Sequence, residues 1–306
     1  MFTQNSKKST TLQEGCVYIV RQPYPMVNTS IVIPKPLLQR YVSSMELRNI
    51  DTGFSEVRKP LHAHHATNMS LFIQSDLPRF ISYNNQAPAF SASDYGNPLA
   101  GLMGIQTYMR GSFLFKGRYK ILNINFQPSG FHELFGIDAA LLTDKLYNAY
   151  QVIGDKIREL HTLLQDVADD RMIFALTEDW ILQMYQRAVK NNFKQWPDLP
   201  VLIDAAAANE TIEQLALMAN MSIRSFERNF NNFVGVRPKL FAQIYRFNQV
   251  LKFKWAHPDT TWSSISDKFK FYDQMHLIKE FKHFGGQTPG RFFNETPPPP
   301  EFIEKL

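Results

Sequence analysis

The 306-residue chain contains one cysteine, Cys16, so it cannot form an internal disulfide, and this scarcity fits a reducing compartment. The chain also lacks any apolar run near the roughly 20 residues that a membrane-spanning helix needs. Residues 1–11 are polar and lack the apolar core of a secretory signal. These absences predict a soluble, cytoplasmic protein without a membrane partner.

The motifs of common enzyme classes are missing as well. The sequence has no glycine-rich phosphate loop and no nucleophile elbow. Its acidic residues Asp94, Asp138 and Asp144 have no catalytic partner at a recognisable spacing. We therefore expect no enzyme and no cofactor.

Positive charge is concentrated in the last third of the chain. Residues 205–292 contain twelve Lys or Arg and seven Asp or Glu, which accounts for the whole formal charge of +5. The remaining residues are neutral overall. A basic segment suits a polyanion such as nucleic acid, but a charge of this size does not identify the partner by itself.

The same last third contains one pattern of about fifty residues twice, which is typical of one supersecondary unit built twice. In the first copy, from Phe226 to Pro238, an apolar residue is followed by a cation, two phenylalanines at helical spacing, a glycine and a proline. The second copy, from Leu277 to Pro289, repeats these features in register.

The first copy predicts two short helices joined by a tight turn. Thr211 and Gln214 form a capping box at the start of the first helix, and Ser222 is the expected N-cap of the second. The inner side of the second helix has phenylalanines at helical spacing, namely Phe226, Phe230 and Phe233. Gly235 then predicts the end of this helix.

The second copy predicts the same architecture. It begins at Thr261, turns near Lys270 and Phe271, and restarts with Asp273 as the cap. Its expected buried residues are Leu277, Phe281 and Phe284. Between the copies, Pro238 to Lys254 has apolar residues at a 3.6-type spacing, which predicts one continuous helix of about 26 Å.

The outward faces of the two second helices carry side chains that bind DNA in other proteins. When the phenylalanines point inward, Arg224 and Arg228 lie together on the opposite face, with Ser225 and Glu227 beside them. The equivalent face of the second copy consists of Gln274, Met275, Lys279, Lys282 and His283. Arg, Lys, Gln and Ser contact base edges and phosphates in a major groove, and two helix-turn-helix units about 34 Å apart can reach successive groove faces of one duplex.

The segment from Ala205 to Phe293 resembles the DNA-binding domain of the AraC/XylS family of bacterial transcription regulators. The resemblance covers a little under a third of the chain and rests on Ile212–Ala216, Met221, Ser222, Phe226–Arg228, Phe230, Gly235, Pro238, Arg246, Phe271, Asp273, Gln274, Phe281, Lys282, Gly286, Thr288 and Pro289. It implies two helix-turn-helix modules that bind double-stranded DNA. It also implies contacts at Arg224, Glu227, Arg228, Gln274, Met275 and Lys279. RNA polymerase, a small-molecule effector and a second copy of the chain are the further partners that the family implies.

Three residues depart from the family pattern. Asn220 and Lys270 stand where the family has glycine in the turns, and a lysine with left-handed backbone costs about 1 kcal/mol, so we expect the second module to turn differently. Lys279 replaces the more usual arginine, which suits a phosphate better than a guanine.

The N-terminal region has a different residue pattern from the repeated segment, and its length predicts a separate domain. Short β-rich stretches occur at residues 16–20, 70–73, 79–83, 112–115 and 119–126, and helical periodicity follows from Val152 to Tyr185. These patterns predict an α+β chain: a sensory or dimerisation domain over residues 1–196, a DNA-binding domain over 201–295 and a flexible tail over 296–306. Asn191 to Pro200 is the expected linker. The segment from Leu122 to Ile137, with a short helix after Gly130, looks like the cupin-like sensory half of a subgroup of these regulators.

Two alternatives remain open. His62 and His64, with His65 beside them, could ligate a metal from a barrel strand, which would favour a metal-dependent cupin-like enzyme or a small-molecule binder. The glutamate that a cupin metal site needs a few residues later is missing, since the next one is Glu133. The histidines are therefore interpreted as a surface or loop cluster, without a metal. An alkylation-repair protein would need an acceptor cysteine, and Cys16 lies outside any recognisable acceptor context.

Overall fold

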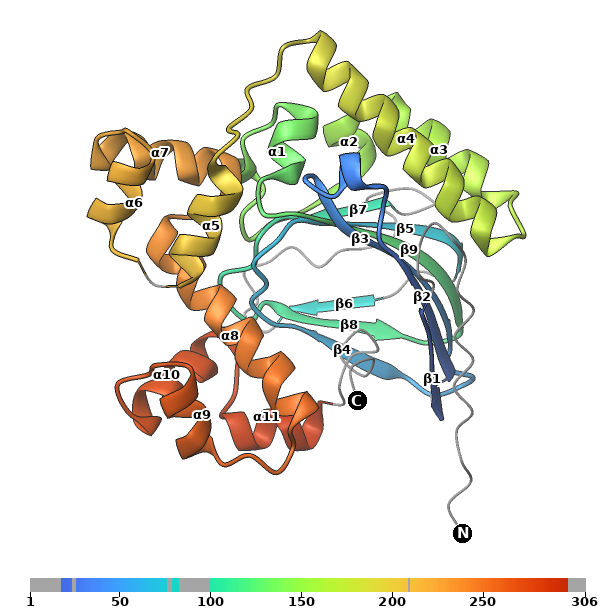
Figure 1. The fold of residues 1–306 in the computed structure, drawn as a ribbon. Helices are drawn as coiled ribbons and strands as arrows, with labels where there is room; N and C mark the ends of the chain where they lie inside the picture. The colour runs from blue at the N-terminus through green and yellow to red at the C-terminus, as the bar shows by residue number, and fades with distance from the viewer. Residues whose placement is uncertain (1–17, 24–25, 76–78, 83–99, 209, 297–306) are drawn as a thin grey trace.

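A β-rich N-terminal part is followed by an all-helical C-terminal part (Figure 1), which confirms the predicted α+β class. This computed structural model describes residues 18–23, 26–75, 79–82, 100–208 and 210–296. Cys16, Asp94 and the expected tail after residue 296 lie outside the described residues. None of the helices within those ranges is long and apolar enough to span a membrane.

The N-terminal part contains two antiparallel sheets that face each other like the walls of a barrel (Figure 1). The larger sheet has the strand order β1 (Tyr18–Pro23), β2 (Met26–Val32), β3 (Val42–Asp51), β9 (Arg118–Phe126), β5 (Asn68–Ser75), β7 (Ala100–Met103) and β10 (Leu146–Asn148). The smaller sheet has the order β4 (Val57–Leu61), β8 (Gly111–Phe115) and β6 (Arg79–Ser82).

The larger sheet has an apolar face and a polar face, because neighbouring strand residues point to opposite sides. Its apolar face contains Met45, Leu47, Met69, Leu71, Leu122 and Ile124, all with an exposed fraction of 0%. Burying each of these side chains contributes about 1.5–3 kcal/mol. The opposite face, toward the smaller sheet, is polar over part of its middle strands: Ser44, Glu46 and Arg48 on β3, Asn123 and Asn125 on β9, Asn68 and Ser70 on β5. At one end of these strands the same face is apolar, and Phe72, Tyr119 and Ile121 pack there with Phe115 of the smaller sheet.

Helices cover the apolar face of the larger sheet (Figure 1). They are α1 (Gly130–Phe135), α2 (Ala149–Ile153), α3 (Asp155–Gln165) and α4 (Asp170–Lys190), with single 3-10 turns at η1 (Pro36–Leu38) and η3 (Ala139–Leu141). Asn148 and Asp169 cap α2 and α4 with their side chains. Gly154, with a φ of 84°, separates α2 from α3, so the predicted helical stretch that begins at Val152 is interrupted there.

The C-terminal part consists of seven helices between residues 199 and 295, within the described chain. They are α5 (Leu199–Ala207), α6 (Ile212–Met218), α7 (Ile223–Val234), α8 (Pro238–Ala256), α9 (Trp262–Lys268), α10 (Gln274–Gly285) and α11 (Pro289–Glu295). A single hydrophobic core runs through all of them. Helix α5 uses the last two residues of the segment expected to be a linker, because Leu199 and Leu202 are buried in this core.

Sequence periodicity located only some of the strands. The described parts of all five predicted β-rich stretches lie in strands, in β1, β5, β6, β8 and β9. Strands β2, β3, β4, β7 and β10 were not predicted. Strand β3 is one of these. Its polar face and its apolar face are both buried, because Glu46 and Arg48 are almost as inaccessible to solvent as Met45 and Leu47.

Candidate nucleic-acid interface

The first helical pair, α6 and α7, has the predicted caps. The Thr211 hydroxyl accepts from the Gln214 amide at 3.3 Å, and the Gln214 side chain accepts from the Thr211 amide at 2.9 Å, which closes the capping box. Ser222 caps α7 by accepting from the amide of Ser225. Gly235 ends α7 in the left-handed conformation. Each expected start and stop signal of this unit is therefore confirmed.

The second pair, α9 and α10, has equivalent caps at Thr261, Asp273 and Gly286. The second module was expected to turn differently, but the difference does not lie at Lys270, because Asn220 and Lys270 have nearly the same left-handed φ, 50° and 55°. Lysine therefore adopts the backbone that glycine would take with less strain. The turn does differ, but through one additional residue before the cap, Tyr272.

The phenylalanine faces of α7 and α10 point inward as predicted. Phe226, Phe230 and Phe233 are fully buried, and Leu277, Phe281 and Phe284 have exposed fractions of at most 2%. Since both helices insert these residues into the same core, their opposite faces are directed to solvent.

The predicted contact residues of α7 lie on its outer face. Arg224 and Arg228 are exposed and one turn apart, and within the described ranges neither guanidinium forms an ion pair. Glu227 is half-buried between them. Ser225 is also half-buried, and its hydroxyl lies 3.0 Å from that of the cap residue Ser222. Two cations are thus the side chains of this face that extend furthest into solvent.

The predicted residues of α10 are all exposed: Gln274, Met275, Lys279 and Lys282. Met275 has 59% of its surface in solvent. The face therefore starts with an amide and an apolar side chain at its N-terminal end and becomes cationic further along.

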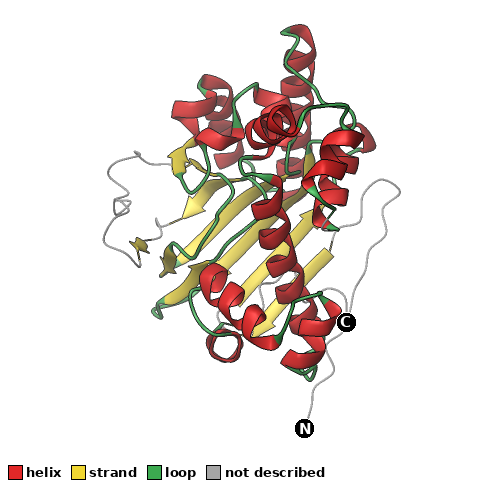
Figure 2. Ribbon diagram, turned by 90° about the vertical axis from the view of Figure 1, so that its left-hand side faces the viewer, coloured by secondary structure: helices red, strands yellow, loops and turns green. Residues whose placement is uncertain are grey.

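Helix α8 joins the two units. It contains 19 residues, which is two more than predicted, and spans about 28 Å at 1.5 Å per residue. Figure 2 shows α8 crossing in front of the two sheets, and Figure 1 shows a helical pair near each end, both on the side of the molecule away from the sheets. The two helices with the cationic faces, α7 and α10, therefore belong to units that one continuous helix, α8, joins.

A buried ion pair fixes α10 to this helix. Arg246 of α8 donates from Nε and Nη2 to the two carboxylate oxygens of Glu280 at 3.1 and 2.6 Å. Its guanidinium also lies 4.3 Å from the ring centre of Phe271, in the turn before α10. A bidentate pair of this kind restrains orientation as well as distance, so it sets the direction in which α10 presents its outer face.

Comparison with known families gives one sequence match, and it covers this pair of units. Residues 215–295 match the family model described as a helix-turn-helix domain. The C-terminal segment is an AraC-type helix-turn-helix domain. No curated protein matches the chain.

A comparison with solved structures finds similarity to ToxT from Vibrio cholerae. The chain is 10% identical to ToxT from Vibrio cholerae O395, with 86% of this chain and 98% of that one covered and a TM-score of 0.41. It is 11% identical to unsaturated fatty acid-bound ToxT from Vibrio cholerae strain SCE256, with 81% and 93% covered and a TM-score of 0.43.

The N-terminal part contacts the first module of the AraC-type domain near the end of α7. The His132 ring of α1 packs on Phe233 with 4.0 Å between ring centres, and burial lowers the pKa of His132. The Thr143 hydroxyl donates to the Gly235 carbonyl at 2.6 Å. The end of α7 is therefore held by α1 and by the segment after η3.

The second module is contacted by the loop between β4 and β5, which contains the three histidines. The Ala63 amide donates to the carbonyl of Phe284 in α10 at 2.9 Å. Asn248 of α8 donates to the Ala63 carbonyl at 2.9 Å, and its side-chain oxygen lies 2.5 Å from His65 Nδ1. Burial lowers the pKa of His65 to about 3, so this ring is neutral near pH 7.

These histidines do form a loop cluster, as interpreted from the sequence, but they are half-buried rather than exposed. His62 packs edge-on against Phe247 of α8 and Phe292 of α11, with ring centres 5.8 and 6.0 Å apart. His64 lies beside His65 rather than on an alternating strand position. The His-x-His pattern thus forms part of the junction with the AraC-type domain.

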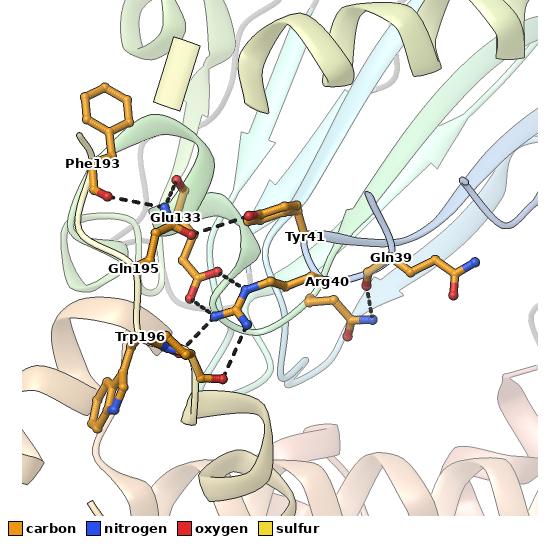
Figure 3. A network of polar contacts seen from close by, with 9 residues as sticks. Gln39, Arg40, Tyr41, Glu133, Phe193, Gln195 and Trp196 are labelled. Carbon is orange, nitrogen blue, oxygen red and sulfur yellow. Dashed lines mark hydrogen bonds and ion pairs between the residues drawn. The ribbon is translucent and has the colours of Figure 1, made fainter. Parts of the chain in front are cut away.

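A polar network holds the segment between α4 and α5 against the barrel (Figure 3). Arg40 forms a bidentate pair with Glu133 at 2.8 and 2.9 Å and also donates to the carbonyl of Trp196 at 2.9 Å. Gln195 donates to the Glu133 carbonyl at 3.0 Å. The Trp196 ring packs edge-on against Phe226 and Phe233 of α7. This connecting segment consequently links the barrel to the hydrophobic core on the inner side of α7, the second helix of the first helix-turn-helix unit.

Sequence patterns did not reveal this junction. Thr143 is 92 positions from Gly235, Asn248 is 185 positions from Ala63 and Trp196 is 156 positions from Arg40, so no local spacing relates them. Two glycines in the sequence did signal a close approach of other segments. Gly235 and Gly286 are left-handed caps, and their missing side chains make room for Thr143 and Met109.

Proposed function

We propose that this chain is a bacterial transcription regulator that binds double-stranded DNA sequence-specifically in the cytoplasm. One observation carries the proposal: two recognition helices of one AraC-type domain expose polar and cationic outer faces, and a single continuous helix joins them. A helix-turn-helix unit inserts its second helix into the major groove. A spacer of about 28 Å, together with the half-width of each unit, is compatible with two groove faces about 34 Å apart.

The exposed residues have separate roles in this proposal. Arg224 and Arg228 bind base edges, and the bidentate fork of arginine favours guanine O6 and N7. Gln274 can form the equivalent bidentate contact with adenine. Lys279 and Lys282 bind phosphates, which provide most of the affinity and make it depend on salt. Ser225 and Glu227 complete the first face, although the contact between Ser225 and Ser222 limits what the Ser225 hydroxyl can do.

Residues 1–196 form the regulatory domain in this proposal. Contacts of the barrel and α1 with both modules support this role, because they connect residues 1–196 to α7 and to α10. The polar inner face of the larger sheet supplies hydrogen-bonding groups that suit a small-molecule effector, including a buried Glu46–Arg48 pair at 2.6 Å. A second copy of the chain and RNA polymerase are further partners that this proposal allows. It involves no catalytic step.

The proposal is tested by selecting duplexes from a random pool with the purified chain and measuring affinity for the enriched sequence. Arg228→Ala should weaken binding to that duplex by about 1–3 kcal/mol and relax the base preference at one position, because one bidentate base contact is lost. Arg187→Ala, which removes an exposed arginine of α4 far from the helix-turn-helix units, is the matched control and should have no effect.

Two results would refute this function. The pool could fail to enrich any sequence, or Arg228→Ala could bind the enriched duplex as tightly as the parent chain does. A loss that is equal for the enriched duplex and for random duplexes would limit Arg228 to a phosphate contact.

A further inference from the structure

The two helix-turn-helix modules align with each other without a gap except at one position, where the second module has one more residue. Thr211 and Thr261 are 50 residues apart, and so are the left-handed residues Asn220 and Lys270. The two cap residues of the recognition helices, Ser222 and Asp273, are 51 residues apart. The second module therefore has one additional residue, Tyr272, directly before the cap of α10.

Tyr272 contributes almost nothing to the core of its module. Its side chain is 93% exposed, whereas the preceding Phe271 is 9% exposed and packs under Arg246. The first module forms the same turn and the same capped helix without a residue at this position. Neither the turn nor the core thus explains why a large aromatic side chain stands here.

A second large apolar side chain is exposed close to it in the sequence. Met275 follows Tyr272 by three residues, occupies the first turn of α10 and is 59% exposed. Its equivalent in the first module is Arg224, which shows that the fold accepts a charged residue at this place. The two modules thus differ at this end of the recognition helix: the first has Arg224 next to Ile223, which is 43% exposed, and the second has the more exposed Tyr272 and Met275.

The major groove offers one apolar group that such a surface can contact. The C5-methyl of thymine is exposed there, and apolar side chains distinguish it from the other groove edges. Gln274, between Tyr272 and Met275, has the amide that pairs with adenine, the partner of thymine. The nearby exposed cations Lys270 and Lys279 can hold phosphates on either side of this contact.

We propose that the second module recognises thymine through its C5-methyl group, by contact with Tyr272 and Met275, while the first module recognises guanine. This inference rests on the proposed function and specifies the DNA sequence class of each half-site. The second half-site is then rich in A·T pairs and the first contains G·C pairs.

Deoxyuridine tests the contact directly, because it pairs like thymine and lacks only the methyl group. In the duplex enriched from a random pool, thymines of the second half-site are replaced by deoxyuridine one at a time. Burying one methyl-sized group is worth about 0.8 kcal/mol, so each contacted position should lose about fourfold in affinity. Replacing thymines in the first half-site should leave the affinity unchanged.

Two variants connect this loss to the protein. Tyr272→Ala and Met275→Ala should each bind the thymine duplex several-fold more weakly than the parent chain and should lose nothing further on the deoxyuridine duplex. Phe54→Ala, which removes a 98% exposed aromatic residue from the loop between β3 and β4, should not affect either duplex. Since all three side chains are exposed, the variants should unfold at the same denaturant concentration as the parent.

The inference is overturned if the enriched second half-site contains no thymine, or if deoxyuridine is bound as tightly as thymine there. It is also overturned if the two alanine variants lose the same factor on both duplexes. In any of these cases a persisting effect of Arg228→Ala would leave the proposed function intact. Loss of both effects would remove the function and the inference together.

Discussion

Individual residues of the AraC-type domain follow local rules that the sequence makes visible. Caps at Thr211, Ser222, Thr261 and Asp273 were predicted from hydroxyl and carboxylate side chains before an apolar stripe, and all four accept the expected amide hydrogen bond. The conformation of Lys270 could not be predicted in the same way. Its left-handed backbone, with a φ of 55°, lies in the turn between α9 and α10 and runs against the local preference of lysine.

This residue allows a prediction about stability. Lys270→Gly should raise the free energy of unfolding by about 1 kcal/mol, because glycine adopts a φ of 55° without steric strain. Asn220→Gly is the matched control in the first module and should produce a smaller gain, since asparagine tolerates this conformation. Urea denaturation measures both values. A loss of stability in Lys270→Gly would show that the lysine side chain makes a contact worth more than the strain.

Helices and strands were predictable where their pattern had a period. The recognition helices and α8 were predicted because phenylalanines and leucines recur at helical spacing. Strand β3 was not predicted, because it contains Glu46, Asn49 and Asp51, residue types that are rare in strands, and β7 was not predicted because its four residues are too few to show a period. The orientation of the helices relative to one another could not be predicted from the sequence either. Contacts such as the one between Arg246 and Glu280 join residues that are 34 positions apart.

The ion pair between α8 and α10 should stabilise this orientation strongly. Glu280→Ala leaves the Arg246 guanidinium, whose side chain is only 13% exposed, without its carboxylate, and should cost about 3 kcal/mol of stability. Glu159→Ala breaks the exposed pair with Lys156, whose side chains are 49% and 62% exposed, and should cost less than about 1 kcal/mol. Equal losses in the two variants would mean that the pair between Arg246 and Glu280 contributes no more than a surface contact.

At the scale of the whole molecule, the N-terminal part is attached to both ends of the DNA-binding unit. Thr143 contacts the end of α7, and Ala63 contacts the end of α10, with α8 between these two points. Neither contact could be predicted from the sequence, where the histidines were interpreted as a surface or loop cluster without a metal. The tertiary contacts give this loop a different role, because they place it against α8, α10 and α11.

The central claim is that two recognition helices bind one duplex at a separation fixed by α8. Its most direct test is the affinity for the enriched duplex after five base pairs are inserted between the half-sites, which turns one half-site by about 180°. A rigid spacer predicts a loss of at least about 100-fold, to the affinity of a single half-site, and predicts no recovery when ten base pairs are inserted, because the second groove then lies about 34 Å further away. Unchanged affinity after the five-base-pair insertion would contradict the claim.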